Sequence, residues 1–238
     1  SNAMLNSFVL NNGCLKNFTN GYGGSLAIAN NAPSTYYKGT TNVTWTVTDG
    51  SGNTNSCIQV ITVTDNQLPV LTSPGNQVFN VITNTCAASY SITDPVSDNC
   101  TGATWSYELS GATVALVTGI SDGSDSGTLS FNKGVTTVLL TAQDASGNQA
   151  IAETFTVTVN DNQLPVLVNP GNQIFSTLGN ICTVDYVISD PINDNCPGAT
   201  WSYVLSGATS GSGSNIAGGT SSGNISFNYG ITNVLLTG

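Results

Sequence analysis

Aspartate is the residue type in this chain whose placement points most directly to chemistry. Only 13 of the 238 residues are acidic, and seven aspartates recur in three kinds of polar segment. Calcium binds six to eight oxygens from carboxylates, amides and backbone carbonyls, so these residues are candidate calcium ligands if the fold brings the segments together. The alternative is that they close turns through their own backbone. The candidates are Asp65, Asp94, Asp98, Asp144, Asp161, Asp190 and Asp194.

Six cysteines form the second set of reactive side chains. They lie in an acidic sequence rich in Thr and Asn, which indicates an oxidising compartment and disulfide bonds. The alternative is six buried thiols in a cytosolic protein. The cysteines are Cys14, Cys57, Cys86, Cys100, Cys182 and Cys196.

The composition excludes several other functions. The chain has no His, and its only basic residues are Lys16, Lys38 and Lys133, so a Ser–His–Asp arrangement is impossible. A net charge of −10 opposes binding to nucleic acid, which depends on Lys and Arg. No apolar run approaches the length of a membrane span. We therefore expect no enzyme, no cofactor other than calcium, no nucleic acid and no membrane insertion.

An internal repeat organises the sequence. The segment from Asp65 recurs from Asp161, and residues 65–140 share 44 of 76 positions with residues 161–236 without a gap. The motif Asp-x-Ser-Gly-Asn also occurs at 49–53 and at 144–148. These matches predict a partial first repeat at 4–64 (repeat 1), a complete repeat at 65–160 (repeat 2), and a third repeat at 161–238 that lacks its last strand (repeat 3). Residues 1–3 resemble the remnant of an expression tag.

Within the repeats, apolar and polar residues alternate with a period of two, which is typical of half-buried strands. The ranges 86–93, 104–110 and 151–160 are clear examples. We expect about seven short strands per repeat, with further strands near Val70, at 128–132 and at 136–143, whereas 111–127 is ambiguous. This pattern predicts an all-β fold of tandem immunoglobulin-like β-sandwich repeats of about 96 residues; another β-sandwich or a β-barrel is the alternative.

The motifs of the repeat resemble those of the hyalin repeat, an immunoglobulin-like module that occurs in tandem in cell-surface and secreted proteins. They are the opening Asp-Asn-Gln-x-Pro at 65–69, Asp94-Pro95 followed by Asp98-Asn99-Cys100, and Gly134 before Asp-x-Ser-Gly-Asn. The resemblance implies adhesion or extracellular architecture, and in bacteria such arrays resemble parts of large surface adhesins. The chain departs from the family where Cys-Pro is usual, because Ser73-Pro74 and Asn169-Pro170 stand there.

The usual late cysteine of the family is also absent from repeat 2, which simplifies the pairing of the others. Cys86 and Cys100 are 14 residues apart, as are Cys182 and Cys196. We therefore expect one disulfide within each repeat, Cys86–Cys100 and Cys182–Cys196. Zinc binding is the alternative, but the usual His partners are missing. For Cys14 and Cys57, either a mutual bond or two unpaired thiols is compatible with the sequence.

In an immunoglobulin-like sandwich, the loop after 86–93 and the turn at 144–148 share one end with the incoming linker. That end would gather Asp65, Asp94, Asp98 and Asp144, and their mutual repulsion calls for a cation. We therefore expect calcium to stiffen the junctions between repeats, unless these residues only close turns.

Two functions fit these observations. The first is a non-catalytic stalk or spacer in an adhesion protein at the cell surface or outside the cell, with neighbouring repeats as partners. The second is a module that binds carbohydrate, including cell-surface or matrix glycans, or another surface such as ice. Outward Thr ladders such as Thr154, Thr156 and Thr158 favour the second, as do the aromatic residues Tyr36, Tyr37 and Tyr229, which fall outside the inward register.

Overall fold

The computed structural model describes residues 27–81, 85–177 and 179–238. The chain divides into two compact units. The first comprises residues up to Gln67 together with Ser146–Asn148, and the second comprises Leu68–Ala145 together with Gln149–Gly238. The described residues form strands and contain no helix. They therefore include no helix that is long and apolar enough to span a membrane. The predicted all-β class is confirmed.

The first unit contains a three-stranded antiparallel sheet in the order β1-β2-β3. Strands β2 and β3 pair from Gly39 opposite Val63 to Thr48 opposite Thr54, across the Asp-x-Ser-Gly-Asn turn. Val43 and Val47 on β2 are buried, as the alternation of this strand predicts. The strands are β1 Ala27–Asn30, β2 Gly39–Thr48 and β3 Thr54–Val63.

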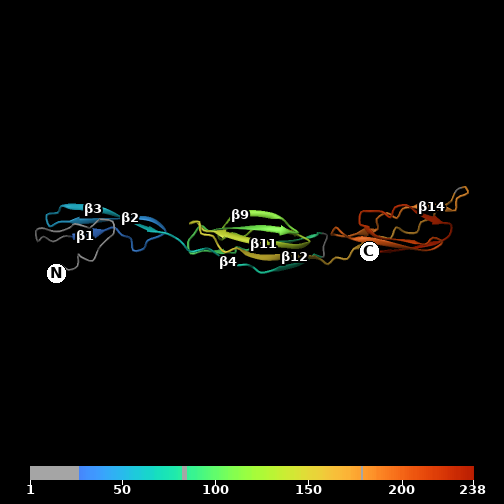
Figure 1. Cartoon of the computed structure of the whole chain (residues 1–238), viewed down its shortest axis with the longest axis horizontal. Coiled ribbons are helices and arrows are strands. Elements are labelled where there is room, and N and C mark those ends of the chain that lie inside the picture. The colour runs from blue at the N-terminus through green and yellow to red at the C-terminus, as the bar shows by residue number, and fades with distance from the viewer. Residues whose placement is uncertain (1–26, 82–84, 178) are drawn as a thin grey trace. The chain divides into compact units, whose positions relative to one another are not determined.

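Repeat 2 forms most of a β-sandwich in the second unit. One face is a five-stranded sheet in the order β5-β12-β11-β8-β9, and the other carries the pairs β10-β6 and β4-β7 (Figure 1). Its strands are β4 Val70–Leu71, β5 Gln77–Val81, β6 Ala87–Ser91, β7 Val96–Ser97, β8 Thr104–Gly111, β9 Ala115–Ser121, β10 Thr128–Asn132, β11 Gly134–Gln143 and β12 Glu153–Asp161.

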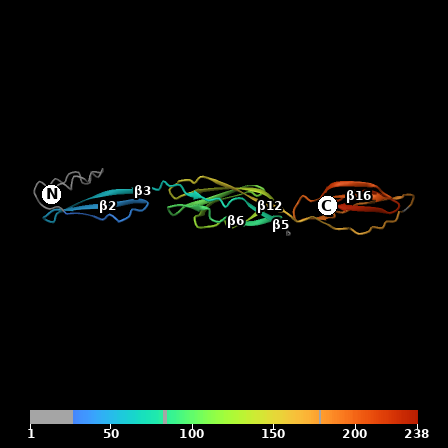
Figure 2. The ribbon, with the colours of Figure 1, turned by 90° about the horizontal axis from the view of Figure 1, so that it is seen from below.

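This topology is immunoglobulin-like. Strand β5, near the start of repeat 2, lies parallel to β12, the last strand of that repeat (Figure 2). Every other strand pair in repeat 2 is antiparallel. The strands that were expected occur within a few residues of their predicted bounds. The ambiguous stretch 111–127 contains an additional strand, β9, which pairs with β8.

The core of repeat 2 consists of the residues that the period-two pattern places inward. Trp105, Phe131, Val138 and Leu140 are each fully buried, and the three alternating residues of β12, from Phe155 to Val159, close the same core. Burying such side chains supplies about 1.5–3 kcal/mol each relative to exposure. Their packing therefore accounts for the sandwich.

Repeat 3 repeats this arrangement with fewer strands. Its sheets are β17-β16-β19, β14-β18 and β13-β15, and Trp201 takes the buried place of Trp105. The strands are β13 Val166–Leu167, β14 Thr183–Tyr186, β15 Ile192–Asn193, β16 Thr200–Gly207, β17 Gly211–Ala217, β18 Ile225–Asn228 and β19 Thr232–Thr237.

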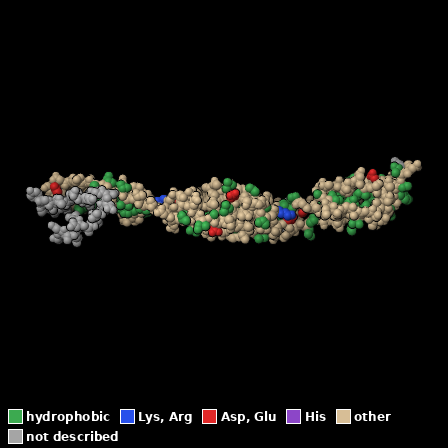
Figure 3. All heavy atoms as spheres, viewed as in Figure 1, with side chains coloured by type: hydrophobic (Ala, Val, Ile, Leu, Met, Phe, Trp, Pro, Cys, Tyr) green, Lys and Arg blue, Asp and Glu red, His purple; other side chains and the backbone are tan. Residues whose placement is uncertain are grey.

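Charged side chains are sparse on the visible surface (Figure 3), in keeping with a charged content of only 7%. Apolar side chains are exposed on the same view over the part formed by repeat 3. Ion pairs are correspondingly few among the described residues.

Two leucines on neighbouring strands test this core. Leu109 on β8 is 2% exposed and Leu116 on β9 is 67% exposed. Leu109→Ala is expected to lower the free energy of unfolding of repeat 2 by about 2–5 kcal/mol, because it leaves a cavity. Leu116→Ala serves as the matched control and should change it by less than about 0.5 kcal/mol. Denaturant unfolding measures both; equal losses in the two variants would contradict the assigned sheet faces.

Candidate functional site

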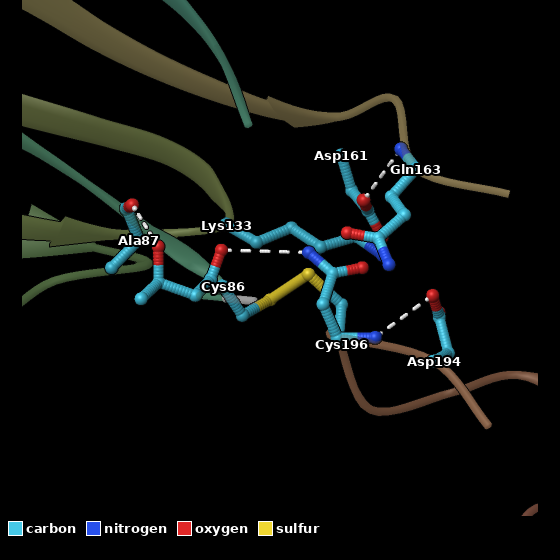
Figure 4. Close-up of a disulfide and its surroundings, with 9 residues drawn as sticks. Cys86, Ala87, Lys133, Asp161, Gln163, Asp194 and Cys196 are labelled. Atoms are coloured by element: carbon cyan, nitrogen blue, oxygen red, sulfur yellow. Dashed lines mark hydrogen bonds and ion pairs between the residues drawn. A yellow bond between two sulfur atoms is a disulfide. The ribbon is translucent and has the colours of Figure 1, made fainter. Parts of the chain in front are cut away.

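A disulfide joins repeat 2 to repeat 3. Cys86, directly before β6, is bonded to Cys196, with 5.0 Å between their Cα atoms and 110 residues between them in sequence (Figure 4). Cys86 lies at the end of repeat 2 where β12 finishes, because its carbonyl accepts a hydrogen bond from the backbone N–H of Lys133, just before β11. We call this end, formed by Cys86, Lys133 and Asp161, the exit pole of repeat 2.

The predicted pairing within repeats is therefore wrong: neither Cys86–Cys100 nor Cys182–Cys196 is present. The reason is the direction of the strand between the two cysteines. Residues 86–92 run extended along β6, and at about 3.3 Å per residue they cross the sandwich over roughly 20 Å. A disulfide needs Cα atoms about 4.4–6.8 Å apart. Cys86 lies beside Lys133, before β11, whereas Cys100 is hydrogen-bonded to Asp98, whose carboxylate lies near Asp144 after β11, so the two cysteines lie at opposite ends of the sandwich.

The other cysteines occupy different environments. Cys182 is an exposed free thiol. Cys100 is half-buried, and its sulfur accepts a hydrogen bond from Asn99 Nδ2 at 3.4 Å. Cys57 is disulfide-bonded; its predicted partner, Cys14, lies outside the described residues.

An ion pair lies beside the disulfide. Lys133 Nζ is 3.2 Å from Asp161 Oδ2, and the Asp161 side chain is 8% exposed. Lys133 extends toward Asp161 and Gln163 (Figure 4). The backbone N–H of Gln163 donates to Asp161 Oδ1 at 3.1 Å, and Asn195 Nδ2 donates to the carbonyl of Thr85 at 3.4 Å. We call these residues together with Cys86 and Cys196 the 2–3 junction.

The junction keeps Asp161 ionised. Burial raises the pKa of Asp161, but hydrogen bonds from Gln163, Lys133 and Asn195 and the charge of Lys133 outweigh it, so the pKa lies below 3.8. An aspartate whose pKa is lower in the folded than in the unfolded state stabilises the folded protein at pH values above its unfolded-state pKa. This contribution is present at neutral pH and is lost as the pH falls through the lowered pKa.

The first compact unit contains an equivalent ion pair. Lys38 Nζ is 3.7 Å from Asp65 Oδ2, and Asn148 Nδ2 donates to the backbone carbonyl of Asp65 at 3.0 Å. Lys38 and Lys133 both directly precede a glycine at the start of a strand, and Asp65 and Asp161 both open the Asp-Asn-Gln motif. The pairing therefore recurs in repeats 1 and 2, whereas Tyr229 takes the place of the lysine in repeat 3.

In two of the predicted calcium ligands, Asp94 and Asp190, both carboxylate oxygens accept backbone N–H groups. Asp94 accepts hydrogen bonds from the N–H groups of Val96 and Gly123. Asp190 accepts the equivalent bonds from Ile192 and Gly219. Since both oxygens of each carboxylate are used, the turn interpretation is favoured for Asp94 and Asp190. Asp94 ties the loop after β6 to the loop after β9. Asp190 ties the loop after β14 to the loop after β17.

Asp98 and Asp144 come together in the second unit. A carboxylate oxygen of Asp98 lies within 4.8 Å of one of Asp144, which is 6% exposed. Asp98 Oδ2 accepts the N–H of Cys100, whereas its buried Oδ1 has no hydrogen-bond partner. Two ionised carboxylates at this distance repel each other, so these oxygens fit a hard cation such as calcium.

The remaining acids are placed as follows. Asp194 Oδ1 accepts the N–H of Asn195 at 3.0 Å. Asp49 closes its own turn, since its carboxylate accepts from the N–H groups of Ser51 and Asn53 and from Asn53 Nδ2. The Asn53 hydrogen bonds lower the pKa of Asp49. Asp65 belongs to the first unit and is paired as described above.

Motifs and spacing in the sequence did not indicate a role for Lys38, Lys133, Gln163 or Asn195. One signal was available: the chain has three basic residues, and two of them occupy the same place in successive repeats. The bond between Cys86 and Cys196 had no comparable signal, because sequence spacing alone favours the nearer cysteine.

No family model matches this chain, and no curated protein matches it significantly. The resemblance to the hyalin repeat therefore remains a prediction from the motifs.

Solved structures give distant matches. The fibronectin(III)-like modules of Clostridium thermocellum CbhA match with a TM-score of 0.31 and 14% identity, over 53% of this chain and 65% of that chain. SGBP-B of the Bacteroides ovatus mixed-linkage glucan utilization locus, solved in complex with a mixed-linkage heptasaccharide, matches with a TM-score of 0.18 and 15% identity, over 85% and 51%. This chain spans less than two thirds of either protein.

Removing Lys133 tests the electrostatics of the junction. In Lys133→Gln the pKa of Asp161 should rise, because the charge of Lys133 is lost while burial remains. The carboxyl carbon resonances of Asp161, followed by NMR across acidic pH, measure this change. Asp49 is the internal control, because Asn53 lowers its pKa and the substitution should leave it unchanged. An unchanged Asp161 titration would show that Lys133 does not act on it.

Proposed function

We propose that this chain is a non-catalytic spacer segment of an extracellular or cell-surface adhesion protein, in which consecutive β-sandwich repeats are held together covalently. The observation that carries this proposal is the Cys86–Cys196 disulfide between repeats 2 and 3. A bond between two repeats contributes little to the core of either. Its main effect is to limit how far one repeat can move from the next.

The chemistry of the bond supports this location and role. Disulfides persist in oxidising environments such as the cell exterior. In the chain-entropy model a closed loop of about 100 residues stabilises the folded state by about 4.7 kcal/mol. The bond therefore couples the stability of two repeats, which suits a segment that bears load between its ends.

Calcium is the second part of the proposal. Asp98 and Asp144 are the residues we assign to the cation, because their oxygens are close together and one of them lacks a hydrogen bond. The cation would neutralise their repulsion and fix the loop after β7 against the turn after β11. It would supply rigidity and no catalysis.

Carbohydrate binding is the weaker candidate. Sugar-binding surfaces commonly present exposed aromatic rings, and among the aromatic residues described Tyr37, Phe175 and Tyr229 are exposed. Every aromatic residue of the complete repeat 2 is buried or half-buried. A surface shared by all repeats therefore has no aromatic platform, which favours a spacer over a glycan-binding array.

Breaking the cross-repeat bond tests the spacer role. In Cys86→Ser, repeats 2 and 3 should reorient independently, because the covalent restraint is gone. Residual dipolar couplings measured for each repeat should then give different alignment tensors, whereas the native protein gives one shared tensor. Cys182→Ser is the matched control, since it changes the equivalent, unbonded cysteine of repeat 3. A shared tensor in Cys86→Ser would refute the spacer mechanism.

Calcium binding is tested by thermal unfolding. At calcium concentrations about ten times the dissociation constant, binding should stabilise the native protein by about 1–2 kcal/mol and raise its melting temperature. Asp144→Asn should abolish this rise. The exposed loop residue Asp122 provides the control Asp122→Asn, which should retain it. If millimolar calcium leaves the melting temperature of the native protein unchanged, Asp98 and Asp144 serve only in turns.

A further inference from the structure

The Cys86–Cys196 bond closes a loop that contains most of repeat 2. The two cysteines are 110 residues apart in sequence, and 5.0 Å separates their Cα atoms. Strands β6 to β15 all lie between them in sequence. A pull on the two ends of the chain therefore passes from Cys86 to Cys196 through the two sulfur atoms. While the bond holds, the backbone between these residues carries none of the tension.

The core of repeat 2 lies almost entirely inside this loop. Of its buried apolar residues, Leu71 and Val81 precede Cys86, and all the others follow it, among them Trp105 and Phe131. The strands β12-β11-β8-β9 are still consecutive in the sheet when β5 is left out, and the β10-β6 pair also belongs to the loop. The loop therefore contains both layers of the sandwich and most of the apolar side chains between them.

Tension reaches Cys86 along an edge strand. The part of repeat 2 that precedes Cys86 forms β4 and β5, and β5 lies at the edge of the five-stranded sheet. Its residues Gln77–Val81 pair in parallel with Val157–Asp161 of β12. A pull along β5 acts in the direction of the strand, so its hydrogen bonds to β12 resist together and do not open one after another. The strands inside the loop are not pulled at all.

The 2–3 junction protects the bond from reduction. Cys196 is 3% exposed and Cys86 is half-buried. Their chain neighbours are joined as well, since Asn195 Nδ2 donates to the carbonyl of Thr85 at 3.4 Å. Reduction of a disulfide requires that a thiolate reach one of its sulfur atoms. The packing of the junction therefore limits the access of a reductant to this bond.

We propose that the Cys86–Cys196 bond is a load bypass. It keeps the folded loop of residues 87–195 free of tension, and it withholds this length of chain until a thiol reductant breaks the bond. At about 3.3–3.6 Å per residue, the loop corresponds to about 360–390 Å of extended chain. This inference rests on the proposed spacer function and adds a redox control of the length of the spacer.

The release step is a thiol–disulfide exchange with a low-molecular-weight dithiol. One thiolate of the dithiol attacks a sulfur of the bond, and the other protein sulfur leaves as a thiolate. The second thiolate of the dithiol then attacks the mixed disulfide and releases the second protein thiolate. Cys86 and Cys196 are reduced to two thiols, the dithiol is oxidised to one disulfide, and the two protons pass through solvent from the dithiol to the protein.

Single-molecule force spectroscopy of the 238-residue chain, held by a tag at each end, tests this proposal. Under rising force, the fully extended native chain should be about 360–390 Å shorter than Cys86→Ser, which lacks the bond. Cys182→Ser is the matched control and should reach the native length, because it leaves the bond in place. Dithiothreitol added to the native chain should restore the missing length.

The timing of this release shows whether the loop stays folded under load. At constant force, residues 162–195 should extend as soon as dithiothreitol cuts the bond, by about 110–120 Å. Strands β6 to β12 should follow after a delay, by about 250–270 Å, because they must first unfold.

Two other outcomes separate this inference from the proposed function. If the native chain is short but releases its whole reserve in one step, the loop was already unfolded under load. The bypass is then overturned, and the spacer function stands, because the bond still joins the repeats. If the native chain and Cys86→Ser reach the same length, the bond is absent, and the bypass and the spacer function are both overturned.

Discussion

The bond between Cys86 and Cys196 is the constraint on which this account depends. A strand such as β6 carries the chain from one end of a sandwich to the other, so a cysteine at its start faces a neighbouring repeat and not its own loop. The bond therefore acts at the joint between two cores that each pack separately around a tryptophan.

The sparse charges of the chain follow the same logic. With 7% charged residues, the surface has little capacity for nonspecific ion pairs, yet Lys38 and Lys133 each meet the aspartate that opens the following linker. Exposed ion pairs contribute little on their own. Beside the disulfide, both carboxylate oxygens of Asp161 are held, one by Lys133 and one by the backbone of Gln163.

Much of the fold was predictable from local patterns, and much of the site was not. Alternation along 104–110 and 151–160 correctly assigned the buried faces of β8 and β12, because inward residues must recur every second position. The irregular stretch that contains β9 gave no such period. The predicted cysteine pairing was wrong for a different reason. Which cysteines can bond depends on where the ends of a strand lie in space, and the separation of 14 residues between Cys86 and Cys100 does not show that the chain between them is extended along β6. Asp94 and Asp98 show the same limit, since both accept backbone N–H groups but only Asp98 keeps a buried carboxylate oxygen without a hydrogen bond.

The most direct measurement is the disulfide map of the native 238-residue protein. Proteolysis without reduction, with free thiols first blocked by alkylation, followed by mass spectrometry, identifies each linked peptide pair. We expect a peptide containing Cys86 joined to one containing Cys196, and Cys182 recovered as an alkylated thiol. A peptide joining Cys86 to Cys100 would contradict it, because each sandwich would then be closed on itself and the junction would have no covalent link.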